Sequence, residues 1–181
     1  MRLMASASAR TARGALAGAA AAAVWSLQES LDQRVFGIAY SDTELLGKWV
    51  TRGPAWPTVG FAMHLANGTA FGAAYAAVAP RMPVPPALRG PLAGMVEHLG
   101  SWPLVGLVDR HHPARDDLPR LSGSRRAFAQ ATWRHLLFGV VLGELERRLN
   151  RGLPGDDEPA VTFAVSSNGH GNIEHAIIGA A

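Results

Sequence analysis

The chain has 181 residues, of which 48% are hydrophobic, 17% are charged and none is cysteine. This composition excludes an intrinsically disordered chain, a disulfide-stapled secreted module and a metal site built from thiolates. Much of the apolar content is alanine and glycine, and these small residues bury little area each. They therefore suit helices packed tightly in lipid better than a soluble core. The net charge of +3 comes from scattered basic residues that form no basic face, so we expect no nucleic-acid partner.

Four apolar stretches predict four hydrophobic helices, at residues 12–29, 58–79, 90–108 and 127–148. The first stretch follows Arg13 and meets its next charge at Glu29. The second lies between Arg52 and Arg81, where 28 uncharged residues exceed the about 20 that a bilayer core requires. We therefore predict an all-α protein whose residues 1–150 form a four-helix transmembrane bundle in a bacterial cytoplasmic (inner) membrane, with the lipid bilayer as a partner.

The N-terminal stretch has a second interpretation. Arginines precede it and Ala-x-Ala sites lie near residues 21–23, as in a cleaved secretory signal. Trp25 and the polar residues after it are instead typical of a retained helix that reaches a membrane interface, and the other tryptophans also lie mostly near segment ends. The membrane orientation stays open, because the Lys and Arg residues other than Arg134, which lies within a predicted helix, divide eight against eight between the two sides.

The amino-acid composition of the chain changes after Arg151. Residues 152–159 read GLPGDDEP and predict a turn-rich acidic linker. Two short β-prone runs then flank a turn at residues 168–171. We interpret residues 151–181 as a linker and a soluble C-terminal tail outside the membrane, in which a small β-hairpin is the structure that the pattern favours.

The predicted helices match each other in pairs. Residues 13–18 read Arg-Gly-Ala-Leu-Ala-Gly and residues 89–94 read Arg-Gly-Pro-Leu-Ala-Gly, so the first and third helices begin almost identically. The second and fourth helices carry matching small residues and histidines at steps of four: Gly60, His64, Gly68 and Gly72 against Ala131, His135, Gly139 and Gly143. These matches favour two parallel two-helix repeats related by an axis along the membrane normal. A chance likeness between glycine-rich helices is the alternative.

Each predicted helix also carries one Gly-x3-Gly pair: Gly14/Gly18, Gly68/Gly72, Gly90/Gly94 and Gly139/Gly143. Residues four apart share a helix face, and glycine there lets two backbones approach closely. We therefore expect these four faces to be the packing faces of the helices.

Polar residues that are rare in membrane helices lie on or beside these faces, and they form our candidate site: His64, Asn67, Glu97, His98, Arg134 and His135. The rise of 1.5 Å per residue brings the three histidines to overlapping depths, so one shared polar site is possible. An unpaired ion inside a membrane costs about 3 kcal/mol or more. We therefore expect Glu97 and Arg134 to pair with each other or with a neighbouring histidine.

Three functions remain open for this cluster, and no enzyme motif or catalytic residue is identified. The first is a non-enzymatic site for a proton, an ion or a small ligand. The second is a structural or assembly role, in which Gly-x3-Gly faces pack a homo-oligomer or a membrane protein partner. The third is haem or metal binding, for which His64, His98 and His135 are weak candidates, as are the loop residues His111 and His112. No cofactor is our leading expectation.

The order of certain residues resembles a known group of proteins: Trp25, His64, Tyr75, Pro80, Arg89-Gly90, His98, the stretch Ala131-Thr-Trp-Arg-His-Leu-Leu-Phe-Gly139, and Gly143-Glu144-Leu-Glu-Arg147. This pattern is similar to uncharacterised actinobacterial four-helix integral membrane proteins and, more distantly, to YagU-type inner-membrane proteins of unknown function. The resemblance covers about residues 12 to 150. It implies a membrane location and carries over no catalytic residue.

Overall fold

A computed structural model describes residues 2–152 and is entirely helical within them. The helices are α1 (Arg2–Phe36), α2 (Asp42–Val50), α3 (Trp56–Val78), α4 (Pro86–Ser101), α5 (Val105–His111) and α6 (Arg125–Asn150). Short 3-10 turns at Ala79–Arg81 and Trp102–Leu104 follow α3 and α4. The predicted all-α class is therefore confirmed for this part of the chain, whereas the predicted hairpin lies outside the described residues.

The long helices differ from the predicted ranges at their ends. Helix α1 continues to Phe36 and ends where Gly37 adopts a left-handed backbone with φ of 64°, the conformation that commonly terminates helices. The third predicted helix, 90–108, is divided into α4, a 3-10 turn and α5. Pro103 lies in that turn and has no backbone N–H to continue the α-helical hydrogen bonds.

The bundle consists of two glycine-packed helix pairs. In the first pair α1 meets α3, and a Cβ added to Gly18 would lie 2.0 Å from the carbonyl oxygen of Gly68. In the second pair α4 meets α6, and a Cβ added to Gly90 would lie 2.1 Å from the carbonyl oxygen of Gly139. All four predicted Gly-x3-Gly faces are thus occupied by contacts within this chain.

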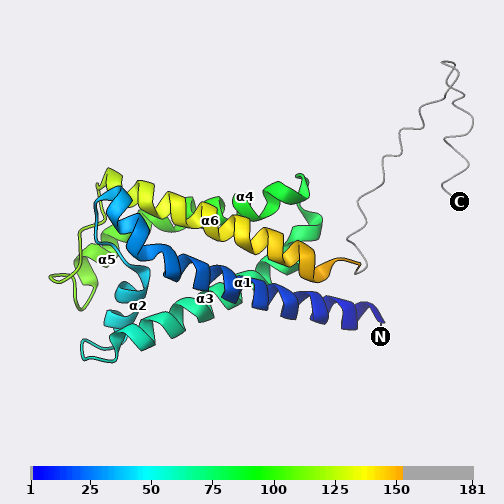
Figure 1. The fold of residues 1–181 in the computed structure, drawn as a ribbon, viewed down its shortest axis with the longest axis horizontal. Helices are drawn as coiled ribbons and strands as arrows, with labels where there is room; N and C mark the ends of the chain where they lie inside the picture. Colours follow the sequence, from blue (N-terminus) through cyan, green and yellow to red (C-terminus); the bar gives the residue numbers. More distant parts are fainter. Residues whose placement is uncertain (1, 153–181) are drawn as a thin grey trace, which may run out of the picture.

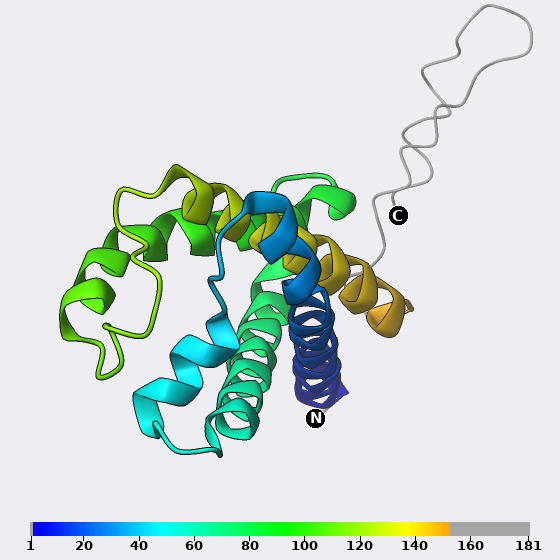
Figure 2. The same ribbon diagram turned by 60° about the vertical axis from the view of Figure 1, so that its left-hand side comes forward.

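The two pairs are joined mainly through α1 and α6, while α2 packs on α3. Figure 1 shows the N-terminal end of α1, the C-terminal end of α6 and the connection from α3 to α4 at one end of the bundle. Helices α2 and α5 lie at the other end, where α3 and α4 diverge (Figure 2). Helices α3 and α4 do not pack directly on each other.

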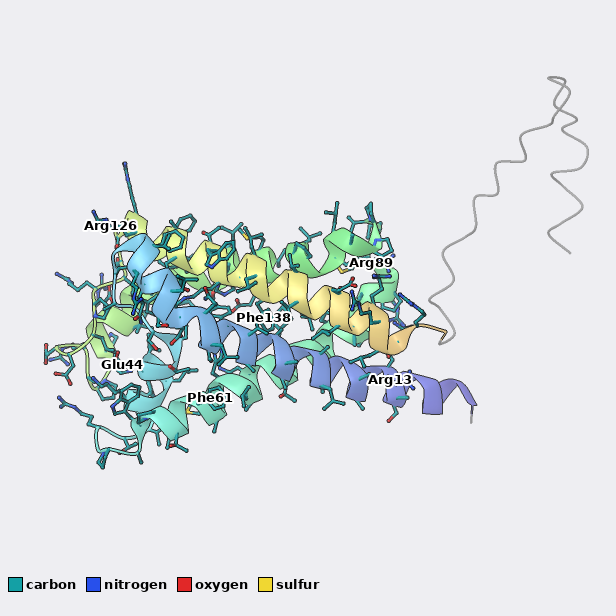
Figure 3. All side chains as sticks on the ribbon, in the orientation of Figure 1. Arg13, Glu44, Phe61, Arg89, Arg126 and Phe138 are labelled. Carbon is teal, nitrogen blue, oxygen red and sulfur yellow. The ribbon has the colours of Figure 1, made fainter. Side chains whose placement is uncertain are left out.

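Small and polar side chains occupy much of the interior, and large apolar side chains occupy much of the surface. The core contains several alanines together with Trp25, Tyr75, Phe138 and Leu142, and Phe138 lies centrally among the helices in Figure 3. Leucine, valine, phenylalanine and tryptophan side chains are exposed on every long helix. Among the helices of residues 2–152, none combines the length and the apolar character that crossing a membrane requires.

Candidate functional site

A cavity of about 240 Å³ lies between the two helix pairs and is lined by residues from all six α-helices. Five of the six predicted site residues line it: His64, Asn67, Glu97, His98 and His135. They come from α3, α4 and α6, so the fold brings together side chains that are 71 positions apart at the extremes. The sixth predicted residue, Arg134, does not line the cavity and belongs to an ion-pair network beside it.

His64 lines this cavity, and one of its ring nitrogens is unused. The residue is only 8% exposed, and its Nε2 atom is buried without a hydrogen-bond partner. The backbone of Ala22 lies close enough to interact with the ring. A neutral imidazole has one donor nitrogen and one acceptor nitrogen. His64 therefore brings one acceptor nitrogen to the wall of the cavity.

His135 and Glu97 form an ion pair at the cavity wall. The Nε2 atom of His135 faces a Glu97 carboxylate oxygen, and its Nδ1 atom lies 2.7 Å from the carbonyl oxygen of Ala131. Both oxygens accept hydrogen bonds, so both ring nitrogens act as donors and the ring is an imidazolium. The expectation that Glu97 pairs with a neighbouring histidine is confirmed. The Glu97 side chain is 40% exposed, so this carboxylate lies at the rim of the cavity.

The tautomer of His98 follows from its partner. The hydroxyl of Thr132 donates its hydrogen to the carbonyl of Phe128 at 2.8 Å, and the same oxygen lies 2.9 Å from Nε2 of His98. Nε2 must therefore be the donor in that contact, which leaves Nδ1 of His98 as a second acceptor. The His98 and His135 rings lie 4.8 Å apart between their centroids.

Aromatic side chains form much of the remaining wall, among them Trp25, Phe71, Phe138 and Trp102. Trp25 contacts the rings of His64 and His135 edge-on, with centroid distances of 5.2 and 4.8 Å. We interpreted Trp25 as an interfacial anchor, but it is only 6% exposed and lies at the centre of the site. That interpretation was wrong because α1 does not end near residue 29 and continues past Trp25 to Phe36.

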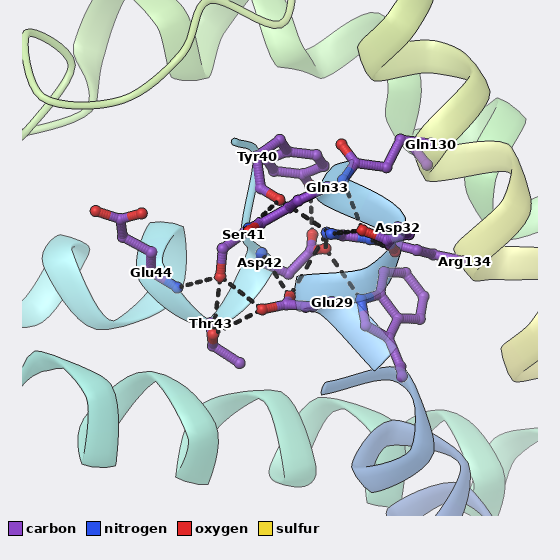
Figure 4. Close-up of polar contacts among 12 residues, drawn as sticks. Glu29, Asp32, Gln33, Tyr40, Ser41, Asp42, Thr43, Glu44, Gln130 and Arg134 are labelled. Atoms are coloured by element: carbon purple, nitrogen blue, oxygen red, sulfur yellow. Dashed lines mark hydrogen bonds and ion pairs between the residues drawn. The ribbon is translucent and has the colours of Figure 1, made fainter. Parts of the chain in front are cut away.

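Arg134 is completely buried and is surrounded by carboxylates (Figure 4). It makes a two-pronged contact with Asp32, with both nitrogen–oxygen distances at 2.6 Å. Its Nη1 atom lies 2.8 Å from Asp42 and 3.5 Å from Glu29. The expectation that Arg134 pairs with Glu97 or with a histidine was therefore wrong. The sequence did contain a signal, because Glu29 and Asp32 are three residues apart and share a helix face.

Asp42 connects this network to the cavity, which it also lines. One of its oxygens accepts from Trp25 at 3.1 Å and from Arg134, and the other accepts from the Tyr40 hydroxyl. Burial alone would raise the pKa of the Asp42 carboxyl, but Arg134 and Tyr40 outweigh it and hold that pKa below its ordinary value. Burial and the neighbouring Asp42 raise the pKa of the Tyr40 hydroxyl well above its ordinary value. Asp42 is therefore ionised at neutral pH and Tyr40 is a neutral donor.

The two loop histidines have different surroundings. His112 is completely buried, with Nε2 bonded to the carbonyl of Leu45 at 2.9 Å and Nδ1 accepting from the Ala114 N–H at 3.0 Å. Nε2 therefore holds the loop onto α2 and Nδ1 stabilises the loop itself, whereas His111 is exposed. In residues 2–152, no three His, Asp or Glu side chains come together as a metal site requires. The residues that line the cavity offer hydrogen-bonding, charged and aromatic groups for non-covalent contact.

No family model, curated protein or solved structure matches this chain.

Proposed function

We propose that the chain is a non-enzymatic membrane protein that binds a small ligand in the cavity between its two helix pairs. The observation that carries this proposal is the buried Nε2 atom of His64, which has no partner and belongs to a side chain that lines the cavity. A buried polar atom without a hydrogen bond costs about 1 to 3 kcal/mol. A ligand that donates a hydrogen bond to this atom would recover much of that free energy.

Exposed apolar side chains support the membrane location. On α1 they recur along one face, at Leu16, Val24, Leu27, Leu31 and Val35. On α4 they recur at Leu88, Leu92, Val96 and Leu99. Contiguous apolar surface of this kind is typical of contact with lipid or with another protein. The likeness to the actinobacterial and YagU-type membrane proteins stays a prediction.

Two further parts of the proposal concern the architecture. The matched glycine contacts, Gly18 on Gly68 and Gly94 beside Gly139, are what two parallel two-helix repeats would produce. Because the Gly-x3-Gly faces are occupied within the chain, a homo-oligomer or a membrane partner would have to use the exposed apolar faces. The main proposal does not depend on such a partner.

We expect the full-length protein to stay in the membrane pellet when bacterial membranes are washed with alkaline carbonate, and to enter the supernatant only with detergent. The physical reason is the apolar surface of α1 and α4, which water solvates poorly. Immunoblotting of the fractions measures this. Release of most of the protein by carbonate alone would contradict the membrane location and would leave the cavity proposal standing.

We expect 4-fluorobenzyl alcohol to bind the detergent-extracted protein saturably, because it combines one hydrogen-bond donor with an aromatic body that matches the cavity wall. Line broadening of its ¹⁹F signal measures binding, and identical micelles with variant proteins correct for partition into detergent. Loss of one hydrogen bond in His64→Phe should weaken binding by about tenfold. Filling the cavity in Val105→Trp should abolish it.

The matched control is His111→Phe, since His111 is exposed and does not line the cavity. This variant should bind like the unmodified protein. Equal broadening in the unmodified protein, His64→Phe and Val105→Trp would contradict the proposed site.

A further inference from the structure

We infer that the ligand of the cavity is a small organic cation, a protonated amine attached to an apolar body. This inference rests on the proposed function, because it specifies the chemical class of ligand that the same cavity would take. Three independent properties of the lining lead to it: the balance of charge, the kind of hydrogen-bonding atoms that remain unused, and the aromatic wall.

Negative charge exceeds positive charge around the cavity. Four carboxylates lie in its wall or in the adjoining network: Glu29, Asp32, Asp42 and Glu97. Two cations face them, the Arg134 guanidinium and the His135 imidazolium. Even when the buried Glu29 is counted as neutral, the carboxylates outnumber the cations, and charge interactions in these surroundings are stronger than in water. A cationic ligand reduces this imbalance, and an anionic ligand increases it.

Each of the two histidines keeps one acceptor nitrogen. A neutral His64 ring has one nitrogen with a lone pair, and its Nε2 atom has no partner. The contact with Thr132 leaves Nδ1 of His98 with a lone pair. An ammonium group has only donors and therefore complements acceptors of this kind. A carboxylate has no proton at neutral pH with which to bond either nitrogen.

The aromatic wall fits the same ligand. Trp25 and Phe138 lie edge to face with their ring centroids 6.1 Å apart, and Phe71 lies 5.6 Å from Phe138. Aromatic faces attract cations by about 0.5 to 2 kcal/mol, depending on how far the cation is desolvated. Tyr40 already provides such a contact for the Arg134 guanidinium, at 5.1 Å from its ring centroid. The lining thus combines groups that attract a positive charge with aromatic side chains that can contact the apolar part of the ligand.

Glu97 is the carboxylate best placed to meet the ligand. Its side chain is partly exposed at the rim, whereas Asp32 and Arg134 are buried behind the wall. It belongs to α4, one of the two helices that diverge around the cavity. We therefore assign Glu97 as a specificity-determining residue that attracts and orients the ammonium group.

A series of four ligands of nearly equal size tests the inference by ¹⁹F line broadening: 4-fluorobenzylamine, 4-fluorobenzyl alcohol, 4-fluorobenzoate and 4-fluorotoluene. At neutral pH only the amine carries a positive charge. We expect the amine to bind at least about tenfold more tightly than the alcohol, and the benzoate to bind most weakly. In Glu97→Gln the ratio of amine affinity to alcohol affinity should fall by about tenfold.

The control for the charge change is Glu44→Gln, because Glu44 does not line the cavity and pairs with Lys48 on α2. This variant should leave the ratio unchanged. If the alcohol binds as tightly as the amine, or the benzoate binds more tightly, the cation inference is wrong and the proposed binding function stands. If no member of the series binds saturably, both are wrong. An unchanged ratio in Glu97→Gln would contradict the assignment of Glu97.

Discussion

Replacing Arg134 by methionine is expected to lower the free energy of unfolding by about 3 to 5 kcal/mol. The side chain is completely buried, and it is the cation that Glu29, Asp32 and Asp42 share. Methionine has a similar reach but no charge, so the variant would leave three carboxylates in the interior without this guanidinium. Thermal unfolding of the detergent-extracted protein, followed by far-ultraviolet circular dichroism, measures the loss.

The control is Arg148→Met. Arg148 pairs with Glu144 on the exposed face of α6, where water and salt screen the pair and its contribution to stability is small. A second variant, Arg134→Met with Asp32→Asn, removes one of the uncompensated charges and should be more stable than Arg134→Met alone. If Arg134→Met and Arg148→Met are equally stable, the network does not hold the fold together.

The second large effect is expected from a single methyl group on a packing face. Gly90→Ala should destabilise the protein by at least about 2 kcal/mol, because overpacking a tight contact forces the backbone to move. The added Cβ would lie 2.1 Å from the carbonyl oxygen of Gly139, and that oxygen belongs to a helix backbone that cannot rotate away. Unfolding followed by circular dichroism measures this change as well.

Helix α4 provides its own control in Gly100→Ala. A Cβ added at Gly100 meets no atom within 4 Å. Alanine is the better helix former, so this variant should gain up to about 1 kcal/mol. The two substitutions are chemically identical and lie in one helix, so a similar effect at both positions would contradict the close approach of α4 and α6.

The packing faces and the cavity residues could be predicted from sequence because both depend on short-range spacing. Glycines four residues apart define a helix face wherever that helix lies, and His64 and His135 follow the same spacing. The all-α class follows from the same periodicity. These predictions needed no knowledge of which helix packs on which.

The partners of Arg134 depended on long-range contacts and could not be predicted in this way. Asp32 and Asp42 lie 102 and 92 positions before it, in residues 30–57, which none of the four predicted helices includes. Helix α2 was missed although its start has a recognisable signal, since the Ser41 hydroxyl accepts from the Glu44 N–H. This N-cap signal predicts a helix that begins at Asp42, but it does not predict the contact between Asp42 and Arg134.

The buried ion pairs also make the two glycine-packed pairs electrostatic complements of each other. The first half of the chain contributes Glu29, Asp32 and Asp42, and the second half contributes the Arg134 guanidinium that they surround. At the opposite end the roles reverse, since Arg10 comes from the first half and Glu146 from the second, 3.1 Å apart. When the two halves pack together, the charges that each half buries are compensated by charges from the other. The ion pairs at the two ends therefore favour one relative orientation of the two halves, and this orientation determines how the cavity between them is formed.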